Sequence, residues 1–368
     1  MTLSETHARL LADAERAGRE LIAVADRGEP GAVNRELVAA LAQHGLLDPV
    51  FGRRDAMALC LLREGLARYC TEAETALALQ GLGGHPILSE GRPELVETWV
   101  PRLAAGTAVA GFALTEPDAG SDVAALSLAA VRDGDGFRLT GEKVYISNAP
   151  DADVYSVFAR TTPGAGARGI TAFAVPAASA GLSGQRIPML APHPIGRLTF
   201  TDVQVPGTHV LGEVDRGMKV AMSTLNLFRP SVGAFAVGMG QAALDAAVAH
   251  AGQRRAFGRS LHEFQAVSHQ LAEVATRLQA ARLLVRAAAQ AHDAGAQEVA
   301  SAAAMAKLFA TETAQFAVDV AIQVHGAKAL EQGHPLEHLY REVRAPRIYE
   351  GASEIQREII ARALFPPT

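Results

Sequence analysis

The stretch SLAAVRDGDGFRLT, residues 127–140, contains two strand-like runs on either side of an Asp/Gly turn. Such a turn between alternating apolar residues is a strong signal for a β-hairpin. Further β-branched or aromatic runs, bounded by glycine and proline, continue to about residue 215. Residues 111–215 are therefore predicted to form an antiparallel sheet or barrel.

Helical patterns flank this β region on both sides. Residues 1–110 are rich in alanine and leucine at helical spacing, and the run GLGGHP, residues 81–86, is expected to be a loop, with a further break at Pro93. Residues 216–368 return to long helices, in which Gly233, Gly238 and Gly240 suggest close helix packing. The order helix, sheet, helix is not that of a Rossmann fold, so it does not support a nicotinamide site of that type.

Composition narrows the class of protein. The chain has 368 residues, of which 49% are hydrophobic, which is enough for two or three domains with their own cores. A net charge of −5 makes nucleic acid an unexpected partner, and no run of eighteen apolar residues predicts a membrane span. Cys60 and Cys70 lie in apolar helical surroundings, so the expected location is the cytoplasm.

Two segments of the β region combine hydroxyl groups with glycine or an aromatic ring. In FALTEPDAGSD, residues 112–122, Thr115, Ser121 and the amides near Gly120 suit a polar ligand such as a flavin or phosphate, but composition alone favours a capping turn. In GEKVYISNA, residues 141–149, strand geometry puts Tyr145 and Ser147 on one face. That face suits a flat heteroaromatic ring, although an ordinary half-buried strand has the same pattern.

Three segments near the C-terminus also carry reactive or charged groups. The arginines in QRRAFGRSLHEFQ, residues 253–265, suit a phosphate or a solvated helix end. The histidines of HPLEH, residues 334–338, are expected on the surface or in packing, because no third metal ligand accompanies them. In RIYEGASEIQR, residues 347–357, Glu350 is either a helix-start acid or a base that accepts a proton.

The order of these segments is specific although each is weak alone. TEPDAGSD, GEKVYISN, RRAFG, QVHGA and RIYEGASEIQR, in this order over essentially the whole chain, resemble the acyl-CoA dehydrogenase family of flavoproteins. The resemblance implies an α+β multidomain chain with a helical domain (1–110), a central β domain (111–215) and a C-terminal four-helix bundle (216–368). It also implies FAD as cofactor and a homotetramer, or a dimer, in which FAD also contacts a neighbouring subunit.

The resemblance assigns roles to individual residues. Glu350 matches the catalytic base, and Phe228 occupies the position where other members carry the base, which favours Glu350. Substrate contacts are implied for Ser121, Asn226, Arg229 and Gly351. Cofactor contacts are implied for Phe112, Leu114, Thr115, Gly120, Ser121, Tyr145, Ile146, Ser147, Arg254, Phe257, Gln265, Gln323, Gly326, Ala327, Ala352 and Glu354.

The implied reaction is α,β-dehydrogenation of an acyl-CoA thioester, with an electron-transferring flavoprotein as acceptor and fatty acid metabolism as the setting. Some positions depart from the family pattern. Ala352 replaces a threonine, Ala327 replaces a glycine, and residues 189–200 lack a usual Ser/Thr-rich run. An acyl-carrier-protein thioester is therefore an alternative substrate. A flavin-dependent monooxygenase and a non-catalytic thioester-binding subunit are further alternatives, and the presence of Glu350 argues against both.

Overall fold

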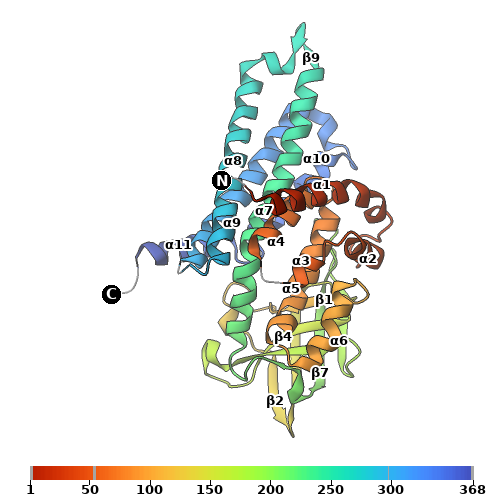
Figure 1. Ribbon diagram of the computed structural model, residues 1–368, viewed down its shortest axis with the longest axis vertical. Helices are drawn as coiled ribbons and strands as arrows, with labels where there is room; N and C mark the ends of the chain where they lie inside the picture. Colours follow the sequence, from red (N-terminus) through yellow and green to blue (C-terminus); the bar gives the residue numbers. More distant parts are fainter. Residues whose placement is uncertain (1–2, 53–54, 297, 366–368) are drawn as a thin grey trace. The chain divides into compact units, whose positions relative to one another are not determined.

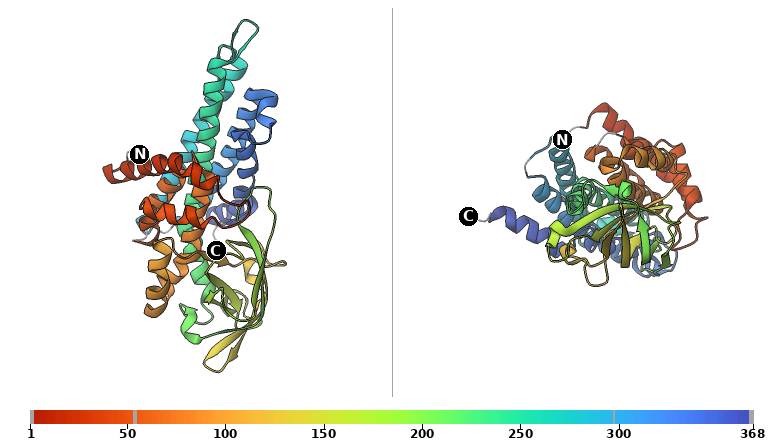
Figure 2. Two further views of the ribbon diagram at one scale, coloured as in Figure 1. Left: turned by 90° about the vertical axis from the view of Figure 1, so that its right-hand side faces the viewer. Right: turned by 90° about the horizontal axis from the view of Figure 1, so that it is seen from below.

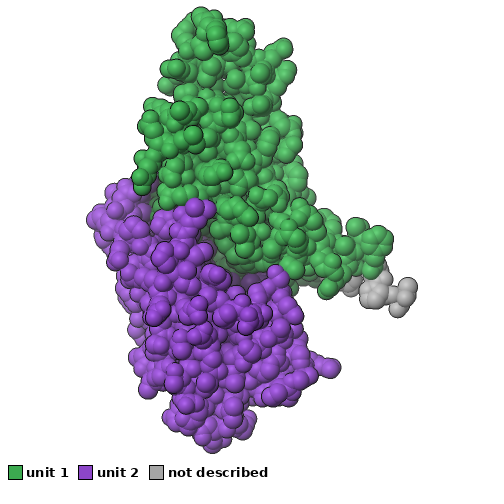
Figure 3. Space-filling view, turned by 180° about the vertical axis from the view of Figure 1, so that it is seen from behind, with its two compact units in different colours: residues 1–20, 55–74, 226–368 green, residues 21–54, 75–225 purple. Residues whose placement is uncertain are grey.

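The computed structural model describes residues 3–52, 55–296 and 298–365. Contacts between residues divide the chain into two compact units, which Figure 3 shows in different colours. Unit 1 comprises residues 1–20, 55–74 and 226–368, and unit 2 comprises residues 21–54 and 75–225. The predicted domain boundaries near residues 110 and 215 stay predictions.

Unit 2 is built around one eight-stranded sheet in the order β6-β7-β3-β2-β4-β5-β8, with β1 paired to β4. The strands, yellow to green in Figure 2, form a twisted sheet. They are β1 (Ala110–Ala113), β2 (Ala129–Asp133), β3 (Gly136–Ser147), β4 (Val154–Arg160), β5 (Ile170–Pro176), β6 (Leu182–Arg186), β7 (Ile195–Val205) and β8 (Val210–Leu211).

The prediction of an antiparallel, barrel-like sheet is corrected in two respects. The sheet is open, because its path ends at β6 and β8, and it is mixed, because β4 pairs in parallel with β1 and β2. The predicted hairpin of β2 and β3 is present, with Asp133 opposite Gly136. Every residue of β4 from Val154 to Ala159 is buried, which is typical of a strand covered on both faces.

Helices complete both units. Unit 2 contains α2 (Arg35–Gln43), α3 (Asp48–Phe51), α6 (Pro93–Ala104) and most of α5 (Thr71–Glu90). Unit 1 contains most of α1 (Glu5–Ala25), α4 (Ala56–Ala67), most of α7 (Gly217–Gln253), α8 (Gln265–Asp293), α9 (Val299–His325), α10 (Pro335–Glu342) and α11 (Ser353–Leu364). The hairpin of β9 (Arg255–Ala256) and β10 (Arg259–Ser260) joins α7 to α8 (Figure 1). Short 3₁₀ helices are η1 (Val123–Ala125), η2 (Gly166–Gly169), η3 (Gly207–His209), η4 (Leu261–Glu263), η5 (Gly326–Leu330) and η6 (Ala345–Arg347).

Two helical predictions need correction. The described part of residues 216–368 contains five α-helices, α7 to α11, rather than a bundle of four. The run GLGGHP is not a loop, because α5 continues through it. A Cβ on Gly83 would lie 2.6 Å from the backbone nitrogen of Gly111 in β1, so this glycine serves close packing of the helix on the strand.

The three glycines of α7 pack as the sequence suggests. A Cβ on Gly233 or Gly240 would lie 2.8 or 2.6 Å from a side chain of α8, and one on Gly238 would lie 2.5 Å from the carbonyl oxygen of Glu64 in α4. By length and composition α7 could also cross a membrane, although no uninterrupted run of eighteen apolar residues predicts this. However, 67% of its apolar window is buried within the protein, as in an ordinary core helix.

A buried ion pair ties the segment after β1 to β3. The Lys143 ammonium is fully buried and donates to the Glu116 carboxylate at 2.8 Å and to the carbonyl oxygen of Leu114 at 2.8 Å. Glu116 also accepts from the backbone N–H groups of Ser127 and Leu128. Burial lowers the pKa of Lys143 to about 8, against the opposing effect of Glu116. The pair therefore fixes residues 114–116, the start of the predicted flavin segment.

Lys143→Met should destabilise the protein by about 3–5 kcal/mol, because it leaves the Glu116 carboxylate buried without its cation. The double variant Lys143→Met/Glu116→Gln should recover part of that loss, since the unpaired charge is then gone. Lys219→Met, at an exposed lysine, is the matched control and should change stability by less than about 0.5 kcal/mol. Chemical denaturation of the four proteins measures this. Equal denaturation midpoints for Lys143→Met and Lys219→Met would contradict the stabilising role of the Lys143–Glu116 pair.

Candidate active site around Glu350

Glu350 lies in a tight turn between η6 and α11. Its φ angle is +51° and that of Gly351 is +93°, so two consecutive residues adopt the left-handed conformation. For a residue with a Cβ this conformation costs roughly 1 kcal/mol, and it persists only where surrounding contacts hold it. Glycine at 351 adopts this conformation without strain. A Cβ at this position would also lie 2.5 Å from Nε2 of the buried Gln356.

The Glu350 side chain is a carboxylate in surroundings that favour its neutral form. Among the described residues, its Oε2 atom is buried and accepts no hydrogen bond. Burial raises the pKa of Glu350, while the charges of Arg63, Arg229 and Lys307 lower it. An acid with a raised pKa and an uncommitted oxygen is the arrangement expected of a general base.

Arg63 of α4 belongs to a buried polar network in unit 1. It forms an ion pair with Glu74, and its Nη1 donates to the Ser231 hydroxyl at 2.8 Å. The Ser231 hydroxyl donates in turn to the carbonyl oxygen of Phe228 at 2.6 Å. Phe228 is only 1% exposed, so the position of the rival base is filled by a packed ring.

Arg229 of α7 is also buried, and its Nη1 donates to the Asn226 side-chain oxygen at 3.0 Å. Burial lowers the pKa of Arg229, and the Glu350 charge acts in the opposite direction. The two predicted substrate contacts, Asn226 and Arg229, are thus hydrogen-bonded to each other, and the charge of the predicted base affects the pKa of Arg229.

The residues that hold the turn lie on α9 and α11. Lys307 donates to the Gly351 carbonyl oxygen at 2.7 Å, and Gln356 donates to the same oxygen at 2.7 Å and to that of Glu350 at 3.3 Å. Ala352 precedes α11 and contributes no side-chain cap, while Glu354 in its first turn is exposed. Sequence reasoning missed Arg63, Lys307 and Gln356. For two of them the sequence contained a signal, because Arg63 and Lys307 are each the only cation in an apolar helical run, LLREGL and AMAKLFA.

The predicted flavin contacts of unit 2 gather along β1, β3 and the segment after β1. Phe112, Leu114 and Ile146 are buried, Thr115 and Ser147 are half-buried, and Gly120 and Ser121 are exposed. Tyr145 sits in a β-bulge with a φ angle of +57° and is 58% exposed. The bulge interrupts the strand alternation from which Tyr145 and Ser147 were predicted to share a face, but the exposed Tyr145 ring is compatible with a flat ligand.

The remaining predicted cofactor contacts lie in unit 1 around the ends of α7, α8 and α9. Phe257 is at the tip of the β9–β10 hairpin with 95% of its surface exposed and a φ angle of +51°. The His325 ring lies 4.2 Å from the His250 ring and 5.6 Å from that of His334, which brings the C-terminal ends of α7 and α9 together. The other contacts, Arg254, Gln265, Gln323, Gly326 and Ala327, are all exposed.

The histidines of HPLEH have separate partners. Nδ1 of His334 accepts from the backbone N–H of Leu336, whereas Nε2 of His338 lies 2.7 Å from the Thr71 hydroxyl and 3.5 Å from Glu72. Each ring is therefore part of local packing, which agrees with the role expected from the sequence.

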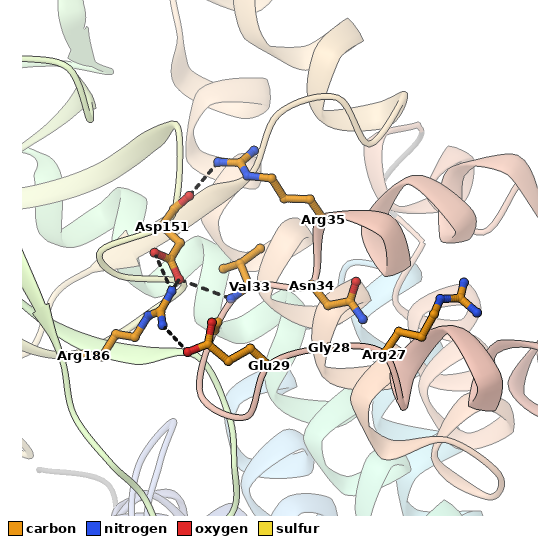
Figure 4. Close-up of a pocket in the computed structure, with 9 residues that line it drawn as sticks. Arg27, Gly28, Glu29, Val33, Asn34, Arg35, Asp151 and Arg186 are labelled. Atoms are coloured by element: carbon orange, nitrogen blue, oxygen red, sulfur yellow. Dashed lines mark hydrogen bonds and ion pairs between the residues drawn. The ribbon is translucent and has the colours of Figure 1, made fainter.

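A separate cavity of about 410 Å³ lies in unit 2 (Figure 4). Its charged walls are neutralised, because Arg186 pairs with Glu29 and Asp151, Arg35 pairs with Asp153, and Arg27 pairs with Glu36. None of the predicted site residues lines this cavity. Its lining consists of Arg27, Gly28, Glu29, Ala32, Val33, Asn34, Arg35, Asp151 and Arg186.

Comparison with known proteins decides the family. Models of the N-terminal, middle and C-terminal domains of acyl-CoA dehydrogenase match residues 4–107, 111–203 and 215–365. The chain belongs to the acyl-CoA dehydrogenase family. The match covers most of the chain, in the order that the sequence motifs indicate.

Individual relatives are similar over nearly their full length. Cyclohexane-1-carbonyl-CoA dehydrogenase of Geobacter metallireducens is 34% identical over 95% of this chain and 94% of its own. The structure of butyryl-CoA dehydrogenase from Megasphaera elsdenii is 31% identical over 99% of both chains, with a TM-score of 0.92. PigA, solved with FAD and proline, is 28% identical over 99% of this chain and 98% of its own, with a TM-score of 0.94. The family and its structures therefore support a flavin-dependent oxidoreductase.

Gly351→Ala should destabilise the protein more than Gly333→Ala. Both glycines have positive φ angles, but a Cβ at Gly333 meets nothing within 4 Å, whereas one at Gly351 meets Gln356. The control should lose about 1–2 kcal/mol from backbone strain. Gly351→Ala should lose about 1–3 kcal/mol more, because the buried amide must move. Thermal unfolding of both variants measures the difference, and equal losses would contradict the role of Gln356.

Proposed function

We propose that this protein catalyses FAD-dependent α,β-dehydrogenation of an acyl-CoA thioester, with Glu350 abstracting the α-proton. The observation that carries the proposal is the Oε2 atom of the half-buried Glu350, which is itself buried and has no hydrogen-bond partner among the described residues. The family membership and the acyl-CoA substrates named for the relatives from Geobacter and Megasphaera support the same substrate class.

Glu350 needs two properties to remove a proton from carbon. It must be more basic than a solvent-exposed carboxylate, and burial provides this by raising its pKa. It must also remain ionised before reaction, and the charges of Arg63, Arg229 and Lys307 favour the ionised form. The balance of burial against these three cations sets the basicity of the carboxylate.

The polar groups predicted to contact FAD fit its chemistry. Thr115, Ser121 and Ser147 offer hydroxyl groups, and the exposed Tyr145 ring offers a flat surface. The exposed Arg254 guanidinium suits a pyrophosphate group. When bound, FAD supplies an acceptor for the β-hydrogen as hydride. Ala352 contributes no hydroxyl, so the hydrogen bonding near this position differs from the usual family pattern.

The partners and setting follow from the family resemblance. We propose that the protein works in the cytoplasm as a homotetramer or dimer, in which Arg254, Phe257, Gln265 and residues 323–327 contact FAD of a neighbouring subunit. The Phe257 ring is available for such a contact, because 95% of its surface is exposed. An electron-transferring flavoprotein is the proposed electron acceptor, and fatty acid metabolism is the proposed setting.

A carrier-protein thioester is the second candidate substrate. Residues 189–200 lack the Ser/Thr-rich run usual in the family, and Met189 and Leu190 are 44% and 62% exposed there. PigA, solved with FAD and proline, is also a structural neighbour. Comparing the same acyl group on CoA and on a carrier protein separates the two candidates.

Glu350→Gln should retain bound FAD and lose flavin reduction by substrate, because an amide cannot accept the α-proton. Anaerobic mixing with butyryl-CoA, cyclohexane-1-carbonyl-CoA and longer acyl-CoAs measures bleaching of the oxidised flavin band. A variant that bleaches as fast as the wild type would place the base elsewhere. If no thioester bleaches the wild type, but NADH and a reductase drive oxygen consumption, the protein is a monooxygenase and the proposal fails.

The dependence of kcat/KM on pH should report the raised pKa of Glu350. Because the ionised carboxylate is the active form, kcat/KM should rise with pH through an apparent pKa above the ordinary carboxyl value of 4.5. Stopped-flow flavin reduction over a pH series measures this dependence. A profile that is already flat at pH values near 4.5 would show that burial does not raise this pKa.

A further inference from the structure

Lys307 is an unusual residue for the middle of an apolar helix. It is fully buried on α9, with alanine at positions 303, 304, 306 and 310 equally buried. Within the part of the chain that the structure describes, no carboxylate lies within ion-pair distance of its ammonium. Its hydrogen bond goes to the backbone carbonyl oxygen of Gly351 at 2.7 Å. Burying a charge is costly, so this placement calls for a reason.

The Gly351 carbonyl oxygen also accepts from the fully buried Gln356 at 2.7 Å. Both lone pairs of this oxygen are thereby used by donors from two different helices, α9 and α11. The same Gln356 amide lies 3.3 Å from the carbonyl oxygen of Glu350. Two consecutive peptide groups of the turn are therefore held from outside the turn.

Such bracing is needed because the backbone at Glu350 does not hold itself. A left-handed glutamate tends to relax to an ordinary conformation unless its neighbours prevent it. Relaxation would rotate the Cα–Cβ bond and move the carboxylate. A shift of about 1 Å in a catalytic group can cost roughly a hundredfold in rate.

We propose that Lys307 is a positioning residue for Glu350, assisted by the uncharged Gln356: together they hold the left-handed Glu350–Gly351 turn, and Lys307 also places a positive charge beside that turn. The inference rests on the proposed function of Glu350. It assigns to Lys307 two separable roles, one through a hydrogen bond and one through charge.

The charged groups around Lys307 are consistent with the second role. Burial lowers the pKa of Lys307 to about 8, and the Glu350 charge acts against this effect. Arg229 of α7 lowers this pKa further, whereas Glu312 of α9 and Glu354 of α11 raise it. Glu312 is already paired with Arg347 of η6 at 2.9 Å. Glu350 is therefore the strongest electrostatic partner of Lys307.

Three variants separate the two roles. Lys307→Met removes the donor and the charge, Lys307→Gln retains a donor without charge, and Gln356→Met removes a donor while no charge is lost. Lys219→Met is the matched control, because Lys219 is exposed and belongs to no predicted site. Each FAD-loaded protein is mixed anaerobically with a saturating acyl-CoA that reduces the wild type, over a range of pH.

Lys307→Met should keep its FAD and reduce flavin roughly tenfold to a hundredfold more slowly, with little change in KM. Its acidic limb should move to higher pH, because loss of the cation raises the pKa of Glu350. Lys307→Gln should show the same pH shift with a smaller loss of rate. Gln356→Met should lose rate without that shift. If Lys307→Met does not fold, the other two variants still test both roles.

The inference is overturned if Lys307→Met and Lys307→Gln match Lys219→Met in rate and in pH profile. It is also overturned if Lys307→Met loses rate only in proportion to lost FAD, because that indicates a purely structural role. Failure of the proposed function is distinguishable, since it appears as undiminished bleaching in Glu350→Gln. An inactive Glu350→Gln beside a fully active Lys307→Met contradicts this inference alone.

Discussion

The turn at Glu350 and Gly351 constrains much of unit 1. Its two residues are left-handed, and the Oε2 atom of Glu350 is buried. Neither the left-handed backbone nor the buried acid is favourable by itself. The conformation requires external hydrogen bonds, and the charge requires cations nearby. Lys307 and Gln356 meet the first need, and Arg63, Arg229 and Lys307 meet the second. These residues come from α4, α7, α9 and α11, so four helices each contribute a side chain to the surroundings of the Glu350–Gly351 turn.

The cost of this arrangement is visible in the burial of charge. Arg63 and Arg229 are 3% and 6% exposed and Lys307 is fully buried, although an apolar side chain would suit each helix better. Buried ionic groups are weak contributors to stability when compared with apolar residues of similar size. Their presence around Glu350 is more simply understood as a setting for its reactivity. Unit 2 has a counterpart in Lys143 and Glu116, which fix the segment that follows β1.

Several features could be predicted from local patterns and others could not. The hairpin at residues 127–140 and the long helices of residues 216–368 follow from turn chemistry and apolar periodicity, and both are present. The parallel pairing of β4 with β1 and β2 was missed, because residues far apart in sequence form it and no local pattern reports strand order. The glycines at 81–86 indicated a loop, whereas tertiary packing against β1 keeps them in a helix.

The sequence by itself determined the family, the order of helical and β regions, and Glu350 as the candidate base. These conclusions depend on short motifs and on Phe228, which occupies the position where other family members carry the base. The tertiary structure alone decided that Glu350 lies in a left-handed turn and which residues hold that turn. Arg63, Lys307 and Glu350 lie up to nearly three hundred positions apart. Burial, pKa and hydrogen bonding arise where such distant segments meet, so no local pattern contains them.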